Sequence, residues 1–306
     1  MIKRRLLPGF LRRNPRIGLC LSGGGCKAFY ALGIGKVLNE EGIHFNAISA
    51  TSAGTAMALS IVENNEEKVM EYFCDLTSRN KSNFHLDKLI RGERPFPHER
   101  MYRQTIQENI DLQSLQKKKT RFYFNSLKFP KHLFPSEEPG KRTRVILKMI
   151  NAYRKEDGLY EKKIIKPLLT SLAVAEGLQE VIFTNKDFID PQRVEDIVLT
   201  TSSAPPFVSL QQLDQEYYLD GGVFDNVPVR VLPKLDLIIA VHYQIESRQI
   251  VEKLGRDRGR NIFWICPTSK LPINMWDYAN PAGVRATYQR GIKDGKNIMR
   301  ILNTFF

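Results

Sequence analysis

The chain has 306 residues, 42% of them hydrophobic and 10% aromatic, which is typical of a folded globular protein and argues against a disordered one. No apolar run approaches the roughly 20 residues that cross a bilayer, and the basic start of the chain lacks the apolar core of a signal peptide. The four cysteines show no CxxC pairing, which argues against a disulfide framework or a structural zinc site and favours a reducing, cytoplasmic environment; they are Cys20, Cys26, Cys74 and Cys266.

The formal net charge of +13 is concentrated in two parts of the chain. Residues 1–16 carry six basic and no acidic side chains, and residues 115–170 carry 15 basic against five acidic ones, whereas the remainder has 25 basic and 28 acidic. This distribution favours one charged face, although a solvated helical surface would give the same pattern. We expect a basic N-terminal arm over 1–16, then one domain over 17–306 with a basic insertion around 128–166.

Apolar runs and helical patterns alternate along the chain. The runs predict strands at 17–22, 44–49, 121–127, 178–184, 235–243 and 261–266, and the patterns predict helices at 28–41, 53–62, 66–78, 141–155, 192–202 and 283–302. A stretch rich in Pro and Lys, 127–142, predicts a long loop. Strands that alternate with helices and are continuously apolar indicate an α/β fold whose sheet is covered on both faces.

The stretch SATSAG places Ser52 between a predicted strand and a predicted helix. Its small neighbours Ala50, Ala53 and Gly54 allow a sharp turn that lifts the hydroxyl clear of the sheet, as in the G-x-S-x-G pattern of hydrolases, with Ala50 in place of the first glycine. Serine is a nucleophile only when a neighbouring base takes its proton. A serine in this position is either such a nucleophile or the N-cap of the following helix.

A second turn of the same kind precedes it, in the stretch LCLSGGGCKAF. Gly23, Gly24 and Gly25 can present backbone N–H groups at the start of a helix, which is an arrangement that stabilises a phosphate or the oxyanion of acyl transfer. The glycine spacing fits neither of the common nucleotide-binding patterns. Lys27 either adds positive charge to this turn or is an ordinary surface lysine.

A third motif, YYLDGGVFDNVPV, places Asp220 at the end of a short strand before Gly221 and Gly222. Asp-Gly by itself is typical of a hairpin turn. The nearby stretch SSAPPF and the following Asn226 and Pro228 make an irregular surround that a simple hairpin would not have.

Together, GGGCK, SATSAG, SSAPPF and DGGVFDNVP resemble, in order and spacing, the patatin-like phospholipase family over roughly residues 15–300. The resemblance implies a three-layer α/β/α fold with a central, mostly parallel sheet. It also implies that Ser52 is the nucleophile, Asp220 its only catalytic partner and Gly23–Gly25 the oxyanion hole. The implied substrates are acyl esters of phospholipids or lysophospholipids. Some bacterial members are activated by a nucleotide or a protein, and the sequence identifies no such activator.

The chemistry of such a pair needs no metal or cofactor. An aspartate, whose pKa is ~3.9 in water, becomes a better base when it is buried, and one carboxylate can then take the serine proton, return it to the leaving alcohol and activate water. The alternative is a Ser-His-Asp esterase, because the order Ser52, Asp220, His242 is that of the α/β-hydrolases.

The stretch KKKTRFYFNSLKFPKHLF interleaves basic residues with five aromatic ones. This mixture suits an anionic membrane surface, with Lys117, Lys118, Lys119 and Arg121 as the candidate contacts. The same mixture could bind nucleic acid or lie partly in the core, and we favour the membrane over nucleic acid. The sequence therefore predicts a cytoplasmic acyl hydrolase that is peripheral at a membrane; the alternative is a binding protein that keeps the fold without turnover.

Overall fold

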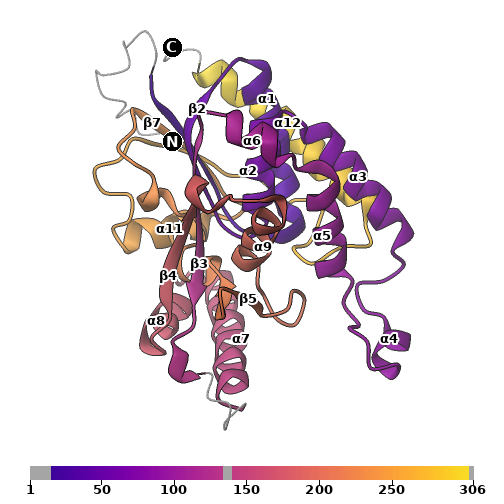
Figure 1. Cartoon of the computed structure of the whole chain (residues 1–306). Helices are drawn as coiled ribbons and strands as arrows, with labels where there is room; N and C mark the ends of the chain where they lie inside the picture. Colours follow the sequence, from indigo (N-terminus) through magenta and orange to yellow (C-terminus); the bar gives the residue numbers. More distant parts are fainter. Residues whose placement is uncertain (1–14, 134–139, 303–306) are drawn as a thin grey trace.

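The computed structural model describes residues 15–133 and 140–302, so most of the predicted basic arm over 1–16 lies outside the described residues. Within them, eight strands form one sheet in the order β5-β6-β3-β2-β1-β7-β8, with β4 paired to β3 (Figure 1). The strands are β1 (Ile17–Leu21), β2 (Phe45–Ala50), β3 (Arg121–Lys128), β4 (Gln179–Thr184), β5 (Gln211–Leu213), β6 (Glu216–Asp220), β7 (Leu237–Val241) and β8 (Ile262–Ile265).

The sheet is mostly parallel, as predicted. Strands β1, β2, β3, β7 and β8 run parallel to one another, while β4 and β6 pair with β3, and β5 with β6, in the antiparallel sense. All six strands expected from apolar runs are present. The run predicted over 235–243 is shorter as a strand, since β7 covers Leu237–Val241, although the N–H of His242 still donates to the carbonyl of Ile265 in β8.

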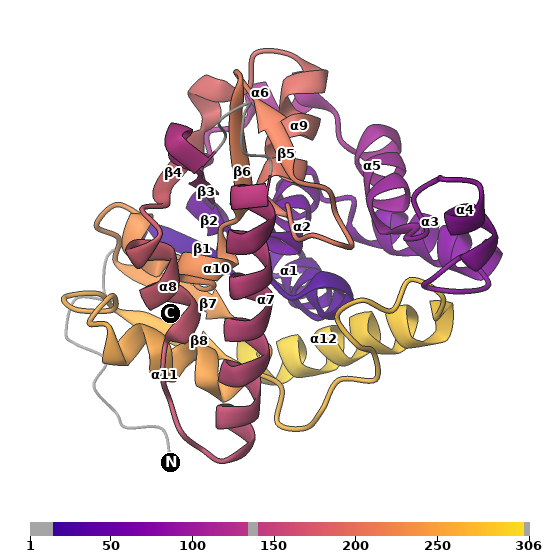
Figure 2. The ribbon, with the colours of Figure 1, turned by 90° about the horizontal axis from the view of Figure 1, so that it is seen from below.

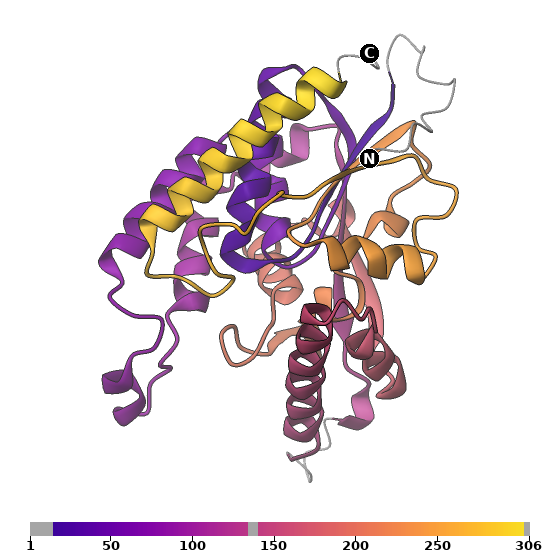
Figure 3. The same cartoon turned by 180° about the vertical axis from the view of Figure 1, so that it is seen from behind.

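Helices cover both faces of the sheet, which gives the three layers of an α/β/α fold (Figures 1 and 3). One face carries α1 (Phe29–Glu40), α2 (Ala53–Glu63), α3 (Glu66–Arg79), α5 (His98–Asn109), α9 (Pro191–Thr201) and α12 (Pro281–Leu302). The other carries α10 (Gly222–Asp225) and α11 (Ile245–Lys253), while α7 (Gly140–Glu161) and α8 (Leu168–Ala175) pack beside the far end of β3. Two short helices, α4 (Leu86–Ile90) and α6 (Leu112–Lys117), complete the described set.

Alternation along the central strands explains why both faces are covered. Leu19 and Leu21 of β1 belong to the large core under α1 and α12, whereas Cys20 belongs to a second core with Ile238 and Ala240 of β7. Since apolar side chains point to both faces, neither face can be left to water. No helix of the described ranges is long and apolar enough to cross a membrane.

The pairing around β3 brings the ends of two distant strands together. Strand β4 pairs with one side of β3 along residues 123–128, so β2 and β6 both pair with the other side of β3. Ala50 at the carboxyl end of β2 lies opposite Phe124, and Asp220 at the carboxyl end of β6 lies opposite Ser126. The two strands therefore point their carboxyl ends at each other.

The predicted loop over 127–142 is wrong at both ends, because β3 continues to Lys128 and α7 begins at Gly140. Between them lie a short 3₁₀ helix, η2 (Lys131–Leu133), and 134–139, which are outside the described residues. Helix α7 also runs to Glu161, past the predicted end at 155. Its last turns are held by Glu156, whose carboxylate accepts hydrogen bonds from the Tyr160 hydroxyl and, at 2.9 Å, from the N–H of Leu169 in α8. Most of the described part of the basic stretch over 128–166 is therefore a packed helix.

Candidate active site

The three glycines after β1 form a turn that leads into a 3₁₀ helix, η1 (Gly25–Ala28). Gly25 has a φ of +53°, and a Cβ on it would lie 2.1 Å from the carbonyl oxygen of Met275, so no other residue fits without moving the backbone. That carbonyl accepts a 2.9 Å hydrogen bond from the N–H of Cys26, which fixes the turn. Among the described residues, no hydrogen bond uses the N–H groups of Gly23, Gly24 or Gly25, so these groups remain free to bind an anion.

Ser52 occupies the turn between β2 and α2, with φ 53° and ψ −136°. Such a backbone conformation is strained for any residue with a side chain, and it is found where function requires it. Although Ser52 is the N-cap of α2 by position, its side chain makes no capping hydrogen bond. The close approach of Gly54 to β1 permits the turn, since a Cβ there would lie 2.8 Å from the carbonyl oxygens of Leu21 and Ser22.

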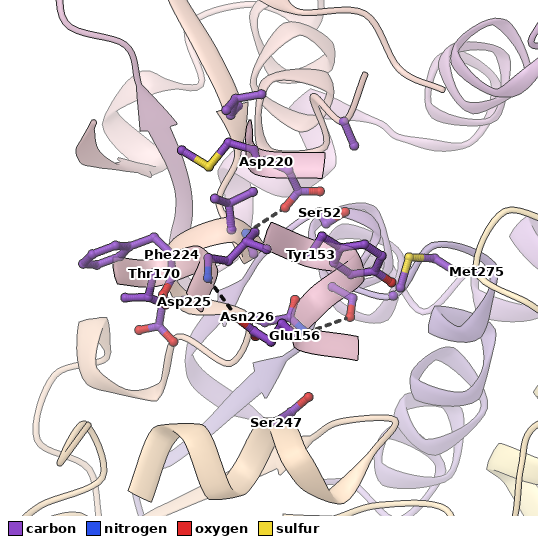
Figure 4. Close-up of a pocket in the computed structure, with 18 of the residues that line it drawn as sticks. Ser52, Tyr153, Glu156, Thr170, Asp220, Phe224, Asp225, Asn226, Ser247 and Met275 are labelled. Atoms are coloured by element: carbon purple, nitrogen blue, oxygen red, sulfur yellow. Dashed lines mark hydrogen bonds between the residues drawn. The ribbon is translucent and has the colours of Figure 1, made fainter. Parts of the chain in front are cut away.

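Asp220 faces Ser52 from the end of β6 (Figure 4). Its N–H donates to the carbonyl of Ser203 at 2.9 Å, and its Oδ1 accepts a 2.7 Å hydrogen bond from the N–H of Gly222. Burial raises the pKa of the Asp220 carboxyl to about 6, although hydrogen bonding by the Ser52 side chain and the Gly222 amide acts in the opposite direction. The carboxylate is therefore a stronger base than an aspartate in water.

Asn226 connects the two loops that carry these residues, a role that the sequence did not reveal. Its Nδ2 donates to the carbonyl of Gly23 at 3.3 Å, and its Oδ1 lies so close to Gly23 and Gly222 that a Cβ on either would approach it to 2.7 Å. Asp225, one residue earlier, is buried. It accepts a 2.9 Å hydrogen bond from Arg230 and forms an ion pair with Arg256 at 3.2 Å. The DGGVFDN motif is thus a folded unit around Asp220.

Ser52, Asp220 and the glycine turn open into one cavity of about 310 Å³. Its walls are mainly apolar, and helix α7 supplies one of them through Ile146, Met149, Ile150 and Tyr153. Polar side chains, among them Glu156, Thr170 and Ser247, line it as well (Figure 4). A cavity of this size and character suits an apolar chain with a polar end. The sequence predicts a helix at 141–155 within the basic insertion around 128–166, but it does not show that this helix lines the site.

The structure does not bring His242 to this cavity. The ring is fully buried, its Nδ1 lies 2.7 Å from the carbonyl oxygen of Gln244, and its edge meets the Trp264 ring. Burial lowers the pKa of His242 to about 4. No histidine of the described residues lines the cavity.

The remaining candidates differ in how close they lie to Ser52. Gly222 lines the cavity and donates to Asp220, and Gly221 packs directly on the backbone of Asn125. Lys27 lies in η1 outside the cavity lining, and burial lowers its pKa while Asp157 partly restores it.

The basic residues Lys117–Lys119 and Arg121 lie between α6 and the first residue of β3. Arg121 pairs in register with Ala47, near the amino end of β2, whereas Ser52 follows the carboxyl end of that strand. This cluster therefore lies at the sheet edge opposite the candidate site.

The chain is similar to one solved structure and to one protein family. The chain resembles the crystal structure of VipD from Legionella pneumophila with a TM-score of 0.39 and 13% sequence identity, over 93% of this chain and 67% of that one. No curated protein matches the chain. The family model described as patatin-like phospholipase matches residues 19–233, which include the glycine turn, Ser52 and Asp220. Since the match spans more than half of its length, the chain belongs to the patatin-like phospholipase family.

Proposed function

We propose that this protein hydrolyses acyl esters of phospholipids or lysophospholipids with Ser52 as nucleophile and Asp220 as the only acid–base group. One observation carries the proposal. The Ser52 hydroxyl stands at a strained turn without capping its helix, and it faces a partly buried carboxylate whose pKa is raised to about 6. A serine hydroxyl at a strained turn, next to a carboxylate of raised pKa that can take its proton, is an arrangement typical of nucleophilic catalysis.

The first half-reaction transfers the acyl group to the enzyme. Asp220 takes the proton of Ser52 as its Oγ bonds to the ester carbonyl carbon, and the carbonyl electron pair moves to the oxygen. The N–H groups of the Gly23–Gly25 turn, with Gly24 and Gly25 nearest the helix start, stabilise that oxyanion. The ester C–O bond then breaks, and Asp220 gives the proton to the departing alcohol.

Water completes the cycle. It loses a proton to Asp220 as it attacks the acyl carbon, and the collapse of this second intermediate breaks the bond to Ser52, which recovers the proton from Asp220. The fatty acid leaves. Loss of one oxyanion donor typically raises such a barrier by ~3 kcal/mol, so the geometry of the glycine turn is as important as the two side chains.

The cavity supports a lipid as the substrate. Ile146, Met149 and Ile150 line it on α7, and Leu219 and Phe224 line it near Asp220, so that an acyl chain exchanges water for apolar contact on entry. The described domain would then act on a membrane surface as a peripheral enzyme, with the basic stretch over 128–166 contributing a wall of the site.

Lipid analysis by mass spectrometry tests the proposal. Purified protein is incubated with vesicles of mixed phospholipids, and we expect free fatty acids together with the matching lysophospholipids. Ser52→Ala and Asp220→Asn should produce neither. The matched variants Ser78→Ala and Asp214→Asn change exposed residues on α3 and on the β5–β6 turn, and they should keep full activity.

Two outcomes would contradict the proposal. If folded parent protein released no acyl product from any lipid, the chain would be a binding protein with the family fold. If Ser52→Ala released products as fast as the parent, the nucleophile would lie elsewhere.

A further inference from the structure

The segment between α3 and α5 forms a projection whose helix, α4, stands away from the body of the protein (Figures 1 and 2). None of the residues of α4 is buried. Three of them are apolar and strongly exposed, namely Leu86 at 60%, Leu89 at 50% and Ile90 at 78%. Large apolar side chains grouped in this way on a short helix are characteristic of an interaction surface.

The base of this projection is fixed to both loops that border the cavity. Asn80 donates from its Nδ2 to the carbonyl of Tyr278 at 2.8 Å, and Asn83 accepts from the N–H of Tyr278 at 2.7 Å. On the other side, Arg94 donates to the carbonyl of Pro206 at 3.0 Å. Pro206 lines the cavity, and Tyr278 follows Met275 and Trp276, which line it as well.

A row of aromatic rings makes the same connection. Phe84 meets Phe96 with 5.5 Å between ring centroids, Phe96 meets Phe207 at 5.0 Å, and Phe207 stacks on Trp276 at 4.3 Å. Phe207 and Trp276 line the cavity, whereas Phe84 is exposed beside α4. A row of packed rings therefore connects Phe84, two residues before α4, with the rim of the cavity.

The charges of the projection favour an anionic partner. Residues 81–94 contain four basic side chains, Lys81, Lys88, Arg91 and Arg94, against the acidic Asp87 and Glu93. Arg91 pairs with both of these carboxylates and Arg94 with Glu99, so among the described residues Lys81 and Lys88 are the cations without an ion pair. Exposed leucine and isoleucine with basic neighbours suit the interface of a bilayer, where apolar side chains enter the acyl boundary and cations remain among the headgroups. A lipid docked at the rim would also reach Ser52 without crossing open water.

We propose that residues 84–91 form the membrane-docking element of this protein, which seats the rim of the cavity on a bilayer that contains anionic phospholipid. The inference rests on the proposed function to the extent that the bilayer supplies the substrate. It differs from the sequence-based expectation for Lys117–Lys119 and Arg121, because those residues lie at the opposite edge of the sheet and a bilayer there would face away from Ser52.

Fluorescence tests docking without any need for catalysis. A tryptophan introduced as Ile90→Trp should shift to shorter wavelength when vesicles of phosphatidylcholine and phosphatidylglycerol are added. Ile189→Trp is the matched control, because Ile189 is 70% exposed and lies near the start of β3, at the opposite edge. Absence of a shift for Ile90→Trp, or an equal shift for both, would overturn the proposal.

Binding and hydrolysis give the second test. The triple variant Leu86→Ser/Leu89→Ser/Ile90→Ser should bind these vesicles at least about tenfold more weakly and hydrolyse them correspondingly more slowly. Its cleavage of soluble p-nitrophenyl butyrate should equal that of the parent, which shows that the fold and Ser52 are intact. Ile189→Ser should match the parent in both assays.

Failure of this inference is distinguishable from failure of the proposed function. The tryptophan fluorescence of the double variant Ser52→Ala/Ile90→Trp should still shift to shorter wavelength when vesicles are added. An inactive protein whose fluorescence shifts in this way retains the docking element and loses only the proposed reaction. An active parent whose triple variant binds vesicles as tightly overturns docking by α4, and the projection would then serve a protein partner. Loss of binding on replacing Lys117, Lys118, Lys119 and Arg121 with Gln, with the triple variant unaffected, assigns the contact to the opposite edge and also overturns it.

Discussion

The backbone strain at Ser52 predicts that glycine at this position is more stable than alanine, although both variants lack the hydroxyl. Ser52 adopts φ 53° and ψ −136°, a conformation that glycine reaches freely and that any Cβ makes costly. Strain of this kind costs of order 1–3 kcal/mol. Ser52→Ala keeps that strain, whereas Ser52→Gly removes it.

The expected difference follows from two opposing effects. Glycine loses more chain entropy on folding than alanine, which offsets about 0.5–1 kcal/mol of the gain. The free energy of unfolding of Ser52→Gly should therefore exceed that of Ser52→Ala by about 1 kcal/mol. For a chain of 306 residues this corresponds to a Tm higher by about 1.5 °C. Ala53→Gly is the control, because this neighbouring position lies in α2 and glycine there should cost about 1 kcal/mol.

Urea and thermal denaturation, followed by circular dichroism, measure the difference. Both Ser52 variants should be inactive on lipids and on soluble esters. If Ser52→Gly were no more stable than Ser52→Ala, the turn would not be strained, and the argument that the fold holds this hydroxyl in place for catalysis would fail.

Three further predictions concern the base, the histidine and the glycine turn. Because the pKa of Asp220 is about 6 and the carboxylate is the reactive form, kcat/KM for a soluble ester should be level above that pH and fall about tenfold per unit below it. Asp220→Asn should abolish turnover and, at pH 8, raise the free energy of unfolding in urea by up to about 2–3 kcal/mol. Burial raises the pKa of Asp220 in the folded protein above 3.8, so ionisation of this carboxyl destabilises the parent protein as pH rises from about 4 to 6. The difference in stability between Asp220→Asn and the parent should therefore vanish below about pH 4. His242→Ala should keep most of the turnover of well-folded protein but lower its Tm, since the ring is buried outside the cavity, and a collapse of kcat would favour a triad. Gly25→Ala should lose turnover in the same ester assay, because its Cβ would displace the Met275 carbonyl, and unchanged kcat would separate this turn from the oxyanion.

Much of the fold could be predicted because the central strands are apolar on both faces. Runs such as Ile17–Leu21 and Leu237–Val241 are apolar without interruption, and this continuity is a direct consequence of burial under two layers of helices. The turn at Ser52 was equally visible, since only small residues such as Gly54 allow α2 to start so close to β1. The family match then confirmed the fold that these local signals indicated.

The remaining features depend on contacts between distant segments. Asp220 meets Ser52 because β2 and β6 share one edge of β3, a pairing that no local pattern specifies. Helix α4 places Leu86, Leu89 and Ile90 at i, i+3 and i+4, but it is only five residues long, and its sequence does not show that these side chains stay exposed. Counting charges located the basic cluster at Lys117–Lys119 along the chain, but only the direction of β3 determines which edge of the sheet it occupies.

Covalent labelling tests the central claim, that Ser52 is an activated nucleophile, most directly. Protein incubated with a fluorophosphonate is digested and mapped by mass spectrometry, with Ser52→Ala and Ser78→Ala treated in parallel. The account predicts one adduct, on Ser52, formed in the parent and in Ser78→Ala and absent from Ser52→Ala, with hydrolysis lost in proportion to labelling. An active protein that stays unlabelled at Ser52, or that loses activity through an adduct on another residue, would contradict it.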